Sequence, residues 1–319
     1  MSSVYWLAHS GIAVAGRTPP RVRHMVASTV TSASYLGWRS KRLITRENMA
    51  TVLGLPVTHP SVRRIALNSW SNYGRTAASL ACLPYVDLLD VDARIQDLTD
   101  GIPWHGHLQS ARAAGKGLII TTGHFGSWDL AGAIAARHVP LSAVVDTFGD
   151  ARLDDLLQGH RRDRSVQIIP VSGAPRGVLR EMTAGRAVAI VVDRPVTGEH
   201  GVEVSFFGRP TRVPAGAGAL AVKSGAAVVP GYFWYGPKGA YYMRTFPPMY
   251  PQPVSSKSER QQEVQRLTQY MFDCQEEVVR HSPAQWFMFR RFWPGAAAPS
   301  GEAGRRTSSR RIVRHRKPD

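Results

Sequence analysis

The chain lacks the cysteine patterns that define disulfide-rich and zinc-binding proteins. Its 319 residues include two cysteines, Cys82 and Cys274, which lie far apart and form no Cys-x-x-Cys pair. Small secreted domains rely on several disulfides, and zinc sites need clustered Cys and His ligands. The sequence therefore excludes a disulfide scaffold and a cysteine-ligated zinc site, and it indicates a reducing compartment. No His/Cys cluster has metal-ligand spacing either, so we expect no metal and no other cofactor.

Long hydrophobic runs are also missing. The most apolar stretch near the N-terminus, residues 4–16, is 13 residues long and is interrupted by His9 and Ser10. A membrane-spanning helix needs about 20 predominantly apolar residues. A signal peptide would need cations before its apolar stretch, and residues 1–3 (MSS) carry none. The sequence therefore predicts neither a spanning helix nor a signal peptide.

Several catalytic motifs are absent as well. The chain has no Gly-x-Ser-x-Gly elbow, no Gly-x-x-x-x-Gly-Lys-Ser/Thr loop and no Gly-x-Gly-x-x-Gly after a strand. These motifs place a nucleophilic serine or cradle nucleotide phosphates. Their absence argues against a serine hydrolase of that type, a P-loop nucleotide hydrolase and a dinucleotide-binding enzyme.

Acidic residues are scarce at both ends of the chain. The 40 Lys and Arg residues outnumber 23 Asp and Glu, which gives a net charge of +17. Residues 1–46 carry seven cations and no acid, and residues 305–319 carry seven cations against one acid, whereas the 258 residues between them carry only +4. This distribution suits a polyanionic partner that touches the ends, either a nucleic acid or an anionic membrane face.

Aromatic residues accompany the cations at the N-terminus. They are Tyr5, Trp6, Tyr35 and Trp38. Aromatic rings and cations together are typical of helices that lie in the headgroup plane of a membrane. We therefore predict that residues 1–46 form basic, amphipathic, membrane-docking helices that hold the protein at the cytoplasmic face of the plasma membrane. The alternative is an ordinary core helix over residues 4–16.

The middle of the chain alternates between β-rich and helical segments. Hydrophobic residues make up 43 % of the chain, enough for a sizeable core. Apolar residues recur at helical spacing between positions 62 and 80, and a long helix is expected at residues 258–280. Short apolar runs that read as strands occupy residues 117–122, 141–147, 166–171, 187–192 and 226–235, with helical segments between them.

This alternation predicts an α/β fold, with a central, mostly parallel sheet flanked by helices behind the N-terminal helical region. We expect residues 1–294 to form a single α/β domain that includes the basic helices of residues 1–46. Residues 295–319 have almost no large apolar side chains and are predicted to be a basic, disordered tail.

His124 and Asp129 form the first candidate catalytic pair. They follow the strand at residues 117–122, and the carboxyl ends of parallel strands carry the active sites of open α/β sheets. Gly123 and Gly126 flank the histidine and allow a tight strand-to-helix turn. A carboxylate that orients an imidazole produces a base able to activate a hydroxyl. The alternative is a helix-capping histidine beside a solvent-facing aspartate.

Residues 124–129 (HFGSWD) resemble the His-x-x-x-x-Asp/Glu block of bacterial glycolipid acyltransferases. That family comprises the lipid A late acyltransferases (lauroyl and myristoyl transferases) and the related phosphatidylinositol mannoside acyltransferases, within the lysophospholipid acyltransferase-like superfamily. Further blocks follow in the family's order. They are GHRRDRSV at residues 159–166, DRP at 193–195, GVEVSFFG at 201–208, VPAG at 213–216, HSPAQW at 281–286 and RRF at 290–292. Ala284 stands where the family usually has glutamate.

The resemblance implies transfer of a fatty acyl chain from a thioester to a lipid-linked hydroxyl, without an acyl-enzyme. His124 would be the general base and Asp129 its orienting carboxylate, with Glu203 as a rival for that role or a plain surface carboxylate. The residues expected to bind substrate are Arg161, Arg164, Arg194, Phe206, Phe207, Pro214 and Gly216. The arginines would hold phosphate, unless Arg161 only belongs to a solvated helix face, and the phenylalanines would line an acyl groove or the core. The turn at Pro214 would aim backbone N–H groups at an anion.

The sequence therefore favours a monotopic O-acyltransferase of glycolipid or phospholipid biosynthesis. Its expected partners are an acyl-CoA or acyl carrier protein donor, a lipid-linked sugar or phospholipid acceptor, and an anionic membrane surface. Two other functions stay open: a nucleic-acid-binding protein that uses its basic ends, which the near-neutral middle disfavours, and a hydrolase that uses His124 on acyl thioesters and water. The acceptor lipid, the acyl chain length and the oligomeric state are not specified by the sequence.

Overall fold

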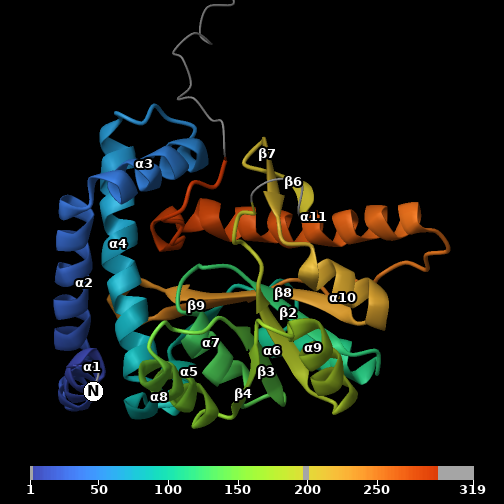
Figure 1. Ribbon diagram of the computed structural model, residues 1–319, viewed down its shortest axis with the longest axis horizontal. Coiled ribbons are helices and arrows are strands. Elements are labelled where there is room, and N and C mark those ends of the chain that lie inside the picture. The colour runs from blue at the N-terminus through green and yellow to red at the C-terminus, as the bar shows by residue number, and fades with distance from the viewer. Residues whose placement is uncertain (1–2, 197–200, 294–319) are drawn as a thin grey trace, which may run out of the picture.

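A seven-stranded sheet lies at the centre of the computed structural model, which describes residues 3–196 and 201–293 (Figure 1). The strand order is β1-β9-β8-β2-β5-β3-β4. Every neighbouring pair is parallel except β8 and β9, which are antiparallel. The strands are β1 (Ile95–Asp97), β2 (Leu118–Thr122), β3 (Leu141–Val145), β4 (Val166–Pro170), β5 (Ala187–Val191), β8 (Ala227–Tyr235) and β9 (Tyr241–Thr245). The predicted α/β fold with a mostly parallel sheet is confirmed.

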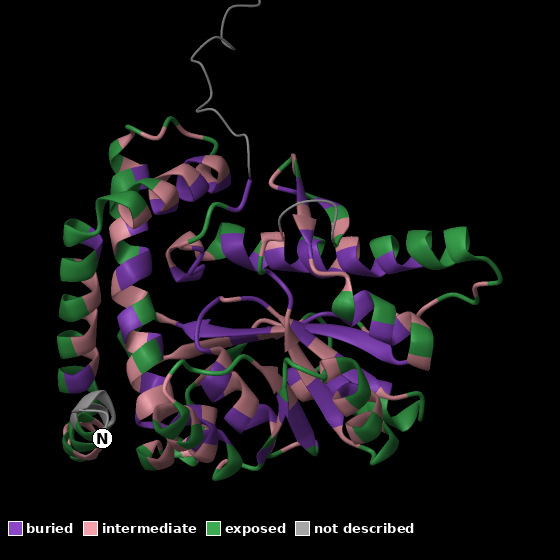
Figure 2. Ribbon diagram, viewed as in Figure 1, coloured by how far each residue is buried: buried purple, intermediate pink, exposed green. Residues whose placement is uncertain are grey.

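Helices bury both faces of this sheet. Successive strand residues point to opposite faces, so Leu118 of β2 belongs to one hydrophobic cluster and Ile119 to the other. The first cluster packs beneath α5 (Leu88–Ala93), α6 (Trp104–Ala113) and α7 (Trp128–Ala135). The second packs against α9 (Ala174–Thr183), α10 (Gly216–Ser224) and α11 (Lys257–His281). Figure 2 shows the resulting buried centre. Strands covered on both sides are typical of parallel sheets.

The N-terminal region is helical, as predicted. It consists of α1 (Ser3–Arg17), α2 (Pro20–Gly37), α3 (Arg39–Leu53) and α4 (Pro60–Ala81). Helices α2 and α4 lie side by side on one flank of the sheet (Figure 1). Gly74 of α4 lets them approach closely, because a Cβ at this position would lie 2.5 Å from the carbonyl oxygen of Ala27. Among the described residues, none of the helices combines the length and the hydrophobicity that crossing a membrane requires.

A two-stranded hairpin, β6 (Val202–Phe206) and β7 (Arg209–Val213), stands apart from the main sheet. Phe207 and Gly208 form its two-residue turn, and both have positive φ, 54° and 68°. Turns of this kind match the right-handed twist of antiparallel strands. The sequence did not predict this hairpin, nor β1 and β9. The remaining helix of the α/β layers is α8 (Ala151–Arg162). The predicted tail, residues 295–319, lies outside the described residues.

Candidate active site

The candidate site is built on the loop between β2 and α7, which contains His124. Strand β2 ends at Thr122, and α7 begins at Trp128. Hydrogen bonds fix the loop on two sides. Gly126 N–H donates to the carbonyl of Gln285 at 2.8 Å, and Phe287 N–H donates to the carbonyl of His124 at 2.8 Å. The C-terminal segment therefore closes over the loop and immobilises the backbone that carries the histidine.

Gly123 and Gly126 are both required because there is no room for a side chain, and Gly126 is also required by its backbone conformation. A Cβ at Gly123 would lie 2.5 Å from Gln275 Nε2 and 2.8 Å from Asp193 Oδ2. Gly126 has a φ of 61°, and a Cβ there would lie 2.1 Å from the carbonyl oxygen of Phe233. Any side chain at either position would displace the groups that surround His124. The expected tight turn is present. The lack of room for a side chain restricts both positions more than the backbone conformation does.

A buried carboxylate, Asp193, holds the His124 imidazole. His124 Nδ1 lies 2.6 Å from Asp193 Oδ1, and the His124 backbone N–H also donates to Asp193, at 2.9 Å to Oδ2. Asp193 is completely buried, whereas about a third of the His124 side chain is exposed, 31 %. Because Nδ1 faces the carboxylate, Nε2 is the ring nitrogen left for another partner. A carboxylate behind one nitrogen and an accessible second nitrogen form a base with its orienting group.

Two further side chains complete the Asp193 environment. Gln275 Nε2 of α11 donates to Asp193 Oδ2 at 2.8 Å, and Trp286 Nε1 donates to the same oxygen at 3.0 Å. Burial disfavours the charged carboxylate, but nearby His124 and the hydrogen bonds from His124 and Trp286 outweigh it and hold the pKa of Asp193 below its usual value. Asp193 therefore stays ionised at neutral pH and can stabilise an imidazolium at His124.

Aromatic rings surround the open side of His124. Trp128 meets the imidazole edge to face at 5.5 Å between ring centroids, and Phe287 lies 6.0 Å from Trp128. Tyr73 of α4 packs against Phe287 at 5.6 Å, and its side chain is exposed on the surface. The mouth of the site is therefore apolar on this side, which suits a hydrophobic reactant.

Asp129 does not orient the histidine, contrary to the sequence-based prediction. Its Oδ1 accepts a hydrogen bond from Arg161 Nε at 2.7 Å, in a buried ion pair between α7 and α8. Arg161 also donates through Nη1 to Gln158 at 2.6 Å. Asp129 sits at the start of α7, which turns its side chain toward α8 instead of back along the loop. Arg161, expected to bind phosphate, is thus occupied by Asp129 and Gln158.

Glu203 is also not the orienting carboxylate. It lies on the exposed face of the β6–β7 hairpin, opposite Arg212. Residues alternate in direction along a strand, so buried Val204 points inward while Glu203 points to solvent. The alternative interpretation, a surface strand carboxylate, is the one that the structure bears out.

Arg164 and Arg194, both expected to bind substrate, lie in different surroundings. Arg164 is a structural side chain, because its Nη2 donates to the carbonyls of Leu83, Pro84 and Val86 at 2.7–2.8 Å. Arg194 follows Asp193 directly and pairs with Asp146 at 2.8 Å on the surface. Only Arg194 therefore remains beside the candidate site.

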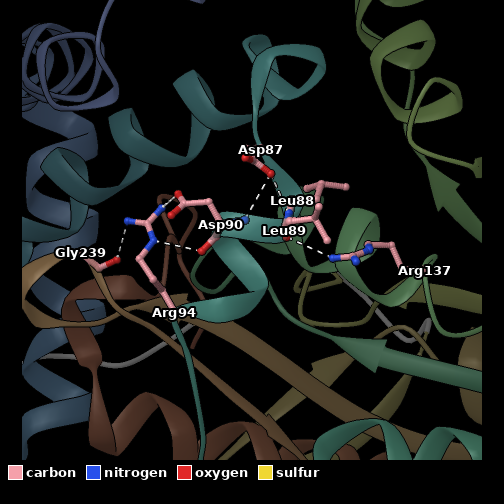
Figure 3. Close-up of polar contacts among 7 residues, drawn as sticks. All are labelled: Asp87, Leu88, Leu89, Asp90, Arg94, Arg137 and Gly239. Atoms are coloured by element: carbon pink, nitrogen blue, oxygen red, sulfur yellow. Dashed lines mark hydrogen bonds and ion pairs between the residues drawn. The ribbon is translucent and has the colours of Figure 1, made fainter.

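A shallow pocket beside Arg164 lies away from His124. Arg137 and Arg164 line it together with Asp87. Figure 3 shows that Asp87 caps the start of α5 and that Arg137 donates to the carbonyl of Leu88. Since these polar groups already have partners, we do not assign a reaction to this pocket.

Phe206 and Phe207 form part of the core instead of an open groove. Phe206 is fully buried, and its ring lies 5.6 Å from the ring of Trp286, which donates to Asp193. Phe206 therefore stabilises the site through Trp286. Phe207 is half-buried beneath Arg280.

Pro214 and Gly216 lie at the start of α10 as predicted, and none of the hydrogen bonds within the described residues links them to His124.

Sequence reasoning missed Asp193, although a signal was available. Asp193 follows β5, which is the parallel neighbour of β2. Carboxyl ends of neighbouring parallel strands meet at one sheet edge, so a carboxylate just after β5 is expected close to His124. Gln275 lies within α11 and had no such signal, whereas Trp286 belongs to the block at residues 281–286 but was given no role. Within residues 3–196 and 201–293, no group of three or more His, Cys, Asp and Glu side chains is arranged to hold a metal ion.

The fold and the histidine–carboxylate pair define an α/β protein with a partly exposed imidazole held by a buried carboxylate after the central strands of a mostly parallel sheet. Residues 1–294 match the family model of bacterial lipid A biosynthesis acyltransferases. The chain belongs to this family, and it is an acyltransferase of lipid biosynthesis.

Curated relatives are similar over most of the chain. A phosphatidylinositol mannoside acyltransferase of Mycobacterium tuberculosis H37Rv is 30 % identical over 256 residues, covering 78 % of this chain and 76 % of the relative. The protein of that name from Mycolicibacterium smegmatis is 29 % identical over 261 residues, covering 78 % of each chain. Among solved structures, the 1-acyl-sn-glycerophosphate acyltransferase PlsC of Thermotoga maritima matches 78 % of this chain and 97 % of its own, with 13 % identity and a TM-score of 0.35.

Proposed function

We propose that the protein transfers a fatty acyl chain from acyl-CoA or acyl carrier protein to a hydroxyl of a glycolipid or phospholipid, with His124 as general base. The observation that carries this proposal is the 2.6 Å contact between His124 Nδ1 and the buried Asp193. This contact orients the imidazole and leaves Nε2 facing the open side of the site. A neutral imidazole in this position can accept a proton from an acceptor hydroxyl.

In the first step, His124 Nε2 removes the proton of the acceptor hydroxyl while its oxygen attacks the thioester carbonyl carbon. A C–O bond forms, and the carbonyl electron pair moves to the oxygen. The resulting imidazolium is stabilised by the ionised Asp193. Gln275 and Trp286 keep Asp193 in place, because each donates a hydrogen bond to it.

In the second step, the tetrahedral intermediate collapses and the C–S bond breaks. The departing thiolate takes the proton from His124 Nε2, which restores the neutral base. The products are the acyl ester and the free thiol, so atoms and charge balance without a cofactor. No acyl-enzyme forms, because the acceptor hydroxyl attacks the thioester directly.

The surroundings of Arg194 favour a donor that carries phosphate. Arg194 and Asp146 form an ion pair on the surface, and Arg290 lies near enough to Asp146 to help lower its pKa, after the larger effect of the hydrogen bond from Arg194. Both CoA and the prosthetic arm of acyl carrier protein bear phosphate, which guanidinium groups bind well. We propose that Arg194 and Arg290 contact this phosphate.

The curated relatives suggest a first acceptor to test. Their names specify phosphatidylinositol mannoside acyltransferases. A mannosylated phosphatidylinositol combines sugar hydroxyls with a lipid anchor, which suits the aromatic mouth beside His124. We propose this class of acceptor ahead of a lipid A precursor.

The N-terminal helices would place the site at the cytoplasmic face of the plasma membrane. Large apolar side chains are exposed on these helices and at the α2–α3 junction: Trp6, Val14, Val22, Met25, Val26, Val30, Leu36, Trp38 and Leu43. Figure 2 shows that the outward face of α2 is mostly exposed. Apolar side chains next to a region without acids favour insertion between anionic headgroups.

An acyl-transfer assay on purified protein in detergent tests this proposal. Radiolabelled palmitoyl-CoA or palmitoyl acyl carrier protein is offered with a bacterial lipid extract that contains mannosylated phosphatidylinositol. We expect a labelled lipid with the wild type and none with His124→Ala. Release of free fatty acid alone would indicate a hydrolase, and equal products from both proteins would rule out His124 as the base.

A further inference from the structure

A cluster of basic side chains lies where α2 packs against α4. Arg23 and His24 come from α2, and Arg75 comes from α4. The Arg75 guanidinium stacks over the ring of Tyr235 at 4.0 Å, and His24 meets the same ring edge to face at 6.2 Å. Tyr235 is buried and fixed by a 2.8 Å hydrogen bond between its hydroxyl and Ser79. The cluster is therefore built on a rigid aromatic base.

The charges of this cluster have no acidic partner among the described residues. Neither Arg23 nor Arg75 takes part in an ion pair there. Arg23 is only 9 % exposed, and its buried Nε–H has no hydrogen-bond acceptor in that part of the chain. Buried His24 Nε2 also has no partner within the same residues. Buried charges are normally paired, because removing them from water is costly.

Another arginine of the chain, Arg94, shows the usual pairing of a cation with a carboxylate. Arg94 stacks on Tyr241 as Arg75 stacks on Tyr235, but Arg94 is neutralised by Asp90 and donates to the carbonyl of Gly239 (Figure 3). By contrast, Arg23 and Arg75 have no acidic partner among the described residues, which leaves both cations available to an external anion.

The effect of these two charges is visible at His24. Burial, Arg75 and Arg23, in this order, lower the pKa of His24 from 6.5 to about 4. No carboxylate opposes this shift. The surroundings of His24 are therefore strongly positive at neutral pH, and an anion would relieve the repulsion.

We propose that Arg23, His24 and Arg75 form a binding site for a phosphate group between α2 and α4. A phosphate offers several acceptor oxygens and up to two negative charges, which match two guanidinium groups and one imidazole N–H. His24 and Arg75 are only half-buried, so the anion can approach from solvent. The site is separate from the chemistry of His124.

Two sources can supply this phosphate. The outward face of α2 carries exposed Val22 and Met25 next to the cluster, which favours the headgroup of an anionic phospholipid. Free phosphate is the other source. The shared chemistry is the oxyanion, and the two sources are separated by the probes below.

The test measures binding of inorganic phosphate by calorimetry and thermal unfolding, against potassium chloride at equal ionic strength. Vesicles of phosphatidylglycerol and of phosphatidylcholine provide the lipid arm. The variants are Arg75→Gln and Arg23→Gln, with Arg64→Gln as a control of equal charge change on the exposed face of α4. Arg75→Lys provides a charged variant in case a Gln variant folds poorly.

We expect the phosphate dissociation constant to rise about tenfold or more in Arg75→Gln and Arg23→Gln, and to change little in Arg64→Gln. Without phosphate, both Gln variants should be at least as stable as the wild type, because each loses an uncompensated cation. A stronger response to phosphatidylglycerol than to inorganic phosphate assigns the ligand to a headgroup, and the opposite order assigns it to free phosphate.

Three results would overturn the proposal. One is the absence of any phosphate- or phosphatidylglycerol-specific effect on the wild type. Another is equal weakening in Arg64→Gln, which would indicate general screening. The third is loss of phosphate binding in Arg194→Gln but not in Arg75→Gln, which would move the anion to the rim of the His124 site.

Discussion

At the scale of single residues, the two buried acidic side chains near His124 have different roles. Asp193 orients His124, whereas Asp129 neutralises Arg161. The two carboxylates differ in what their replacement should do. Asp193 acts on His124, the proposed base, and Asp129 acts on the packing of α7 against α8.

Asp129→Asn should mainly destabilise the fold. Asp129 and Arg161 side chains are 6 % and 10 % exposed, so the substitution leaves a buried guanidinium without its counter-charge. Loss of one partner of a buried ion pair costs about 3–5 kcal/mol. Denaturant unfolding should show this loss, and the double variant Asp129→Asn/Arg161→Met should recover much of it. A double variant as unstable as the single one would contradict this role.

His24 should make the protein less stable in mild acid. Its pKa is about 4 in the folded protein and 6.5 as a free side chain, so the unfolded chain binds the proton first. Stability should therefore fall as the pH drops from 6.5 toward 4, by roughly 2 kcal/mol. Urea unfolding across this range should show a smaller decline in His24→Gln than in the wild type. Identical declines would show that His24 does not titrate in this way.

At the level of one residue, the sequence pointed to His124 but not to the carboxylate that holds its imidazole. His124 was found because it follows a strong strand and lies between two glycines. Asp129 was chosen for its sequence proximity, and proximity along the chain does not decide which way a helix residue points. The carboxylate that contacts His124 lies 69 positions away, just after the neighbouring parallel strand β5.

Among the elements, the α2–α4 contact depends on Gly74. A Cβ there would meet the backbone of Ala27, which cannot move aside as a side chain can. This contact positions the exposed face of α2 and both halves of the basic cluster. The N-terminal helices are therefore part of the packed structure.

Gly74→Val should displace α2 from α4. We expect a loss of at least about 2 kcal/mol and faster amide exchange in α2, because the helices cannot approach as closely. Gly11→Ala is the control, since a Cβ at Gly11 meets nothing within 4 Å. It should leave stability unchanged or raise it by up to about 1 kcal/mol. Gly74→Val with unchanged stability would contradict the close packing.

Long, regular elements were predictable, and short ones were not. Apolar runs in β2, β3, β4, β5 and β8 are strong signals because both faces of these strands are buried. β1 has only three residues, and the β6–β7 hairpin alternates polar and apolar residues over five residues per strand. Tertiary pairing, not local sequence, creates such elements.

At the scale of the whole molecule, the exposed apolar side chains of α2 lie within the acid-free residues 1–46. The predicted docking to anionic membranes concerns this surface as a unit. Its orientation on a membrane could not be derived from sequence periodicity, because that orientation depends on a partner outside the packed core.

Val26→Glu should weaken binding to phosphatidylglycerol vesicles about tenfold or more, because a charge replaces an apolar group at the headgroup boundary. Val171→Glu is a matched control, since Val26 and Val171 are exposed to similar extents, 55 % and 53 %, and Val171 lies outside α1–α3. Vesicle flotation at low and high salt should separate the two variants. Equal weakening in both would contradict docking through α2.

The central claim is that Asp193 orients His124 for acyl transfer, and the rate of labelled-lipid formation tests it most directly. The comparison uses wild type, Asp193→Asn and the exposed-carboxylate control Glu203→Gln, each shown to be folded by circular dichroism. We predict a loss of about a thousandfold or more in Asp193→Asn and less than about threefold in Glu203→Gln. A folded Asp193→Asn variant with nearly wild-type transfer, or a Glu203→Gln variant equally impaired, would contradict the account.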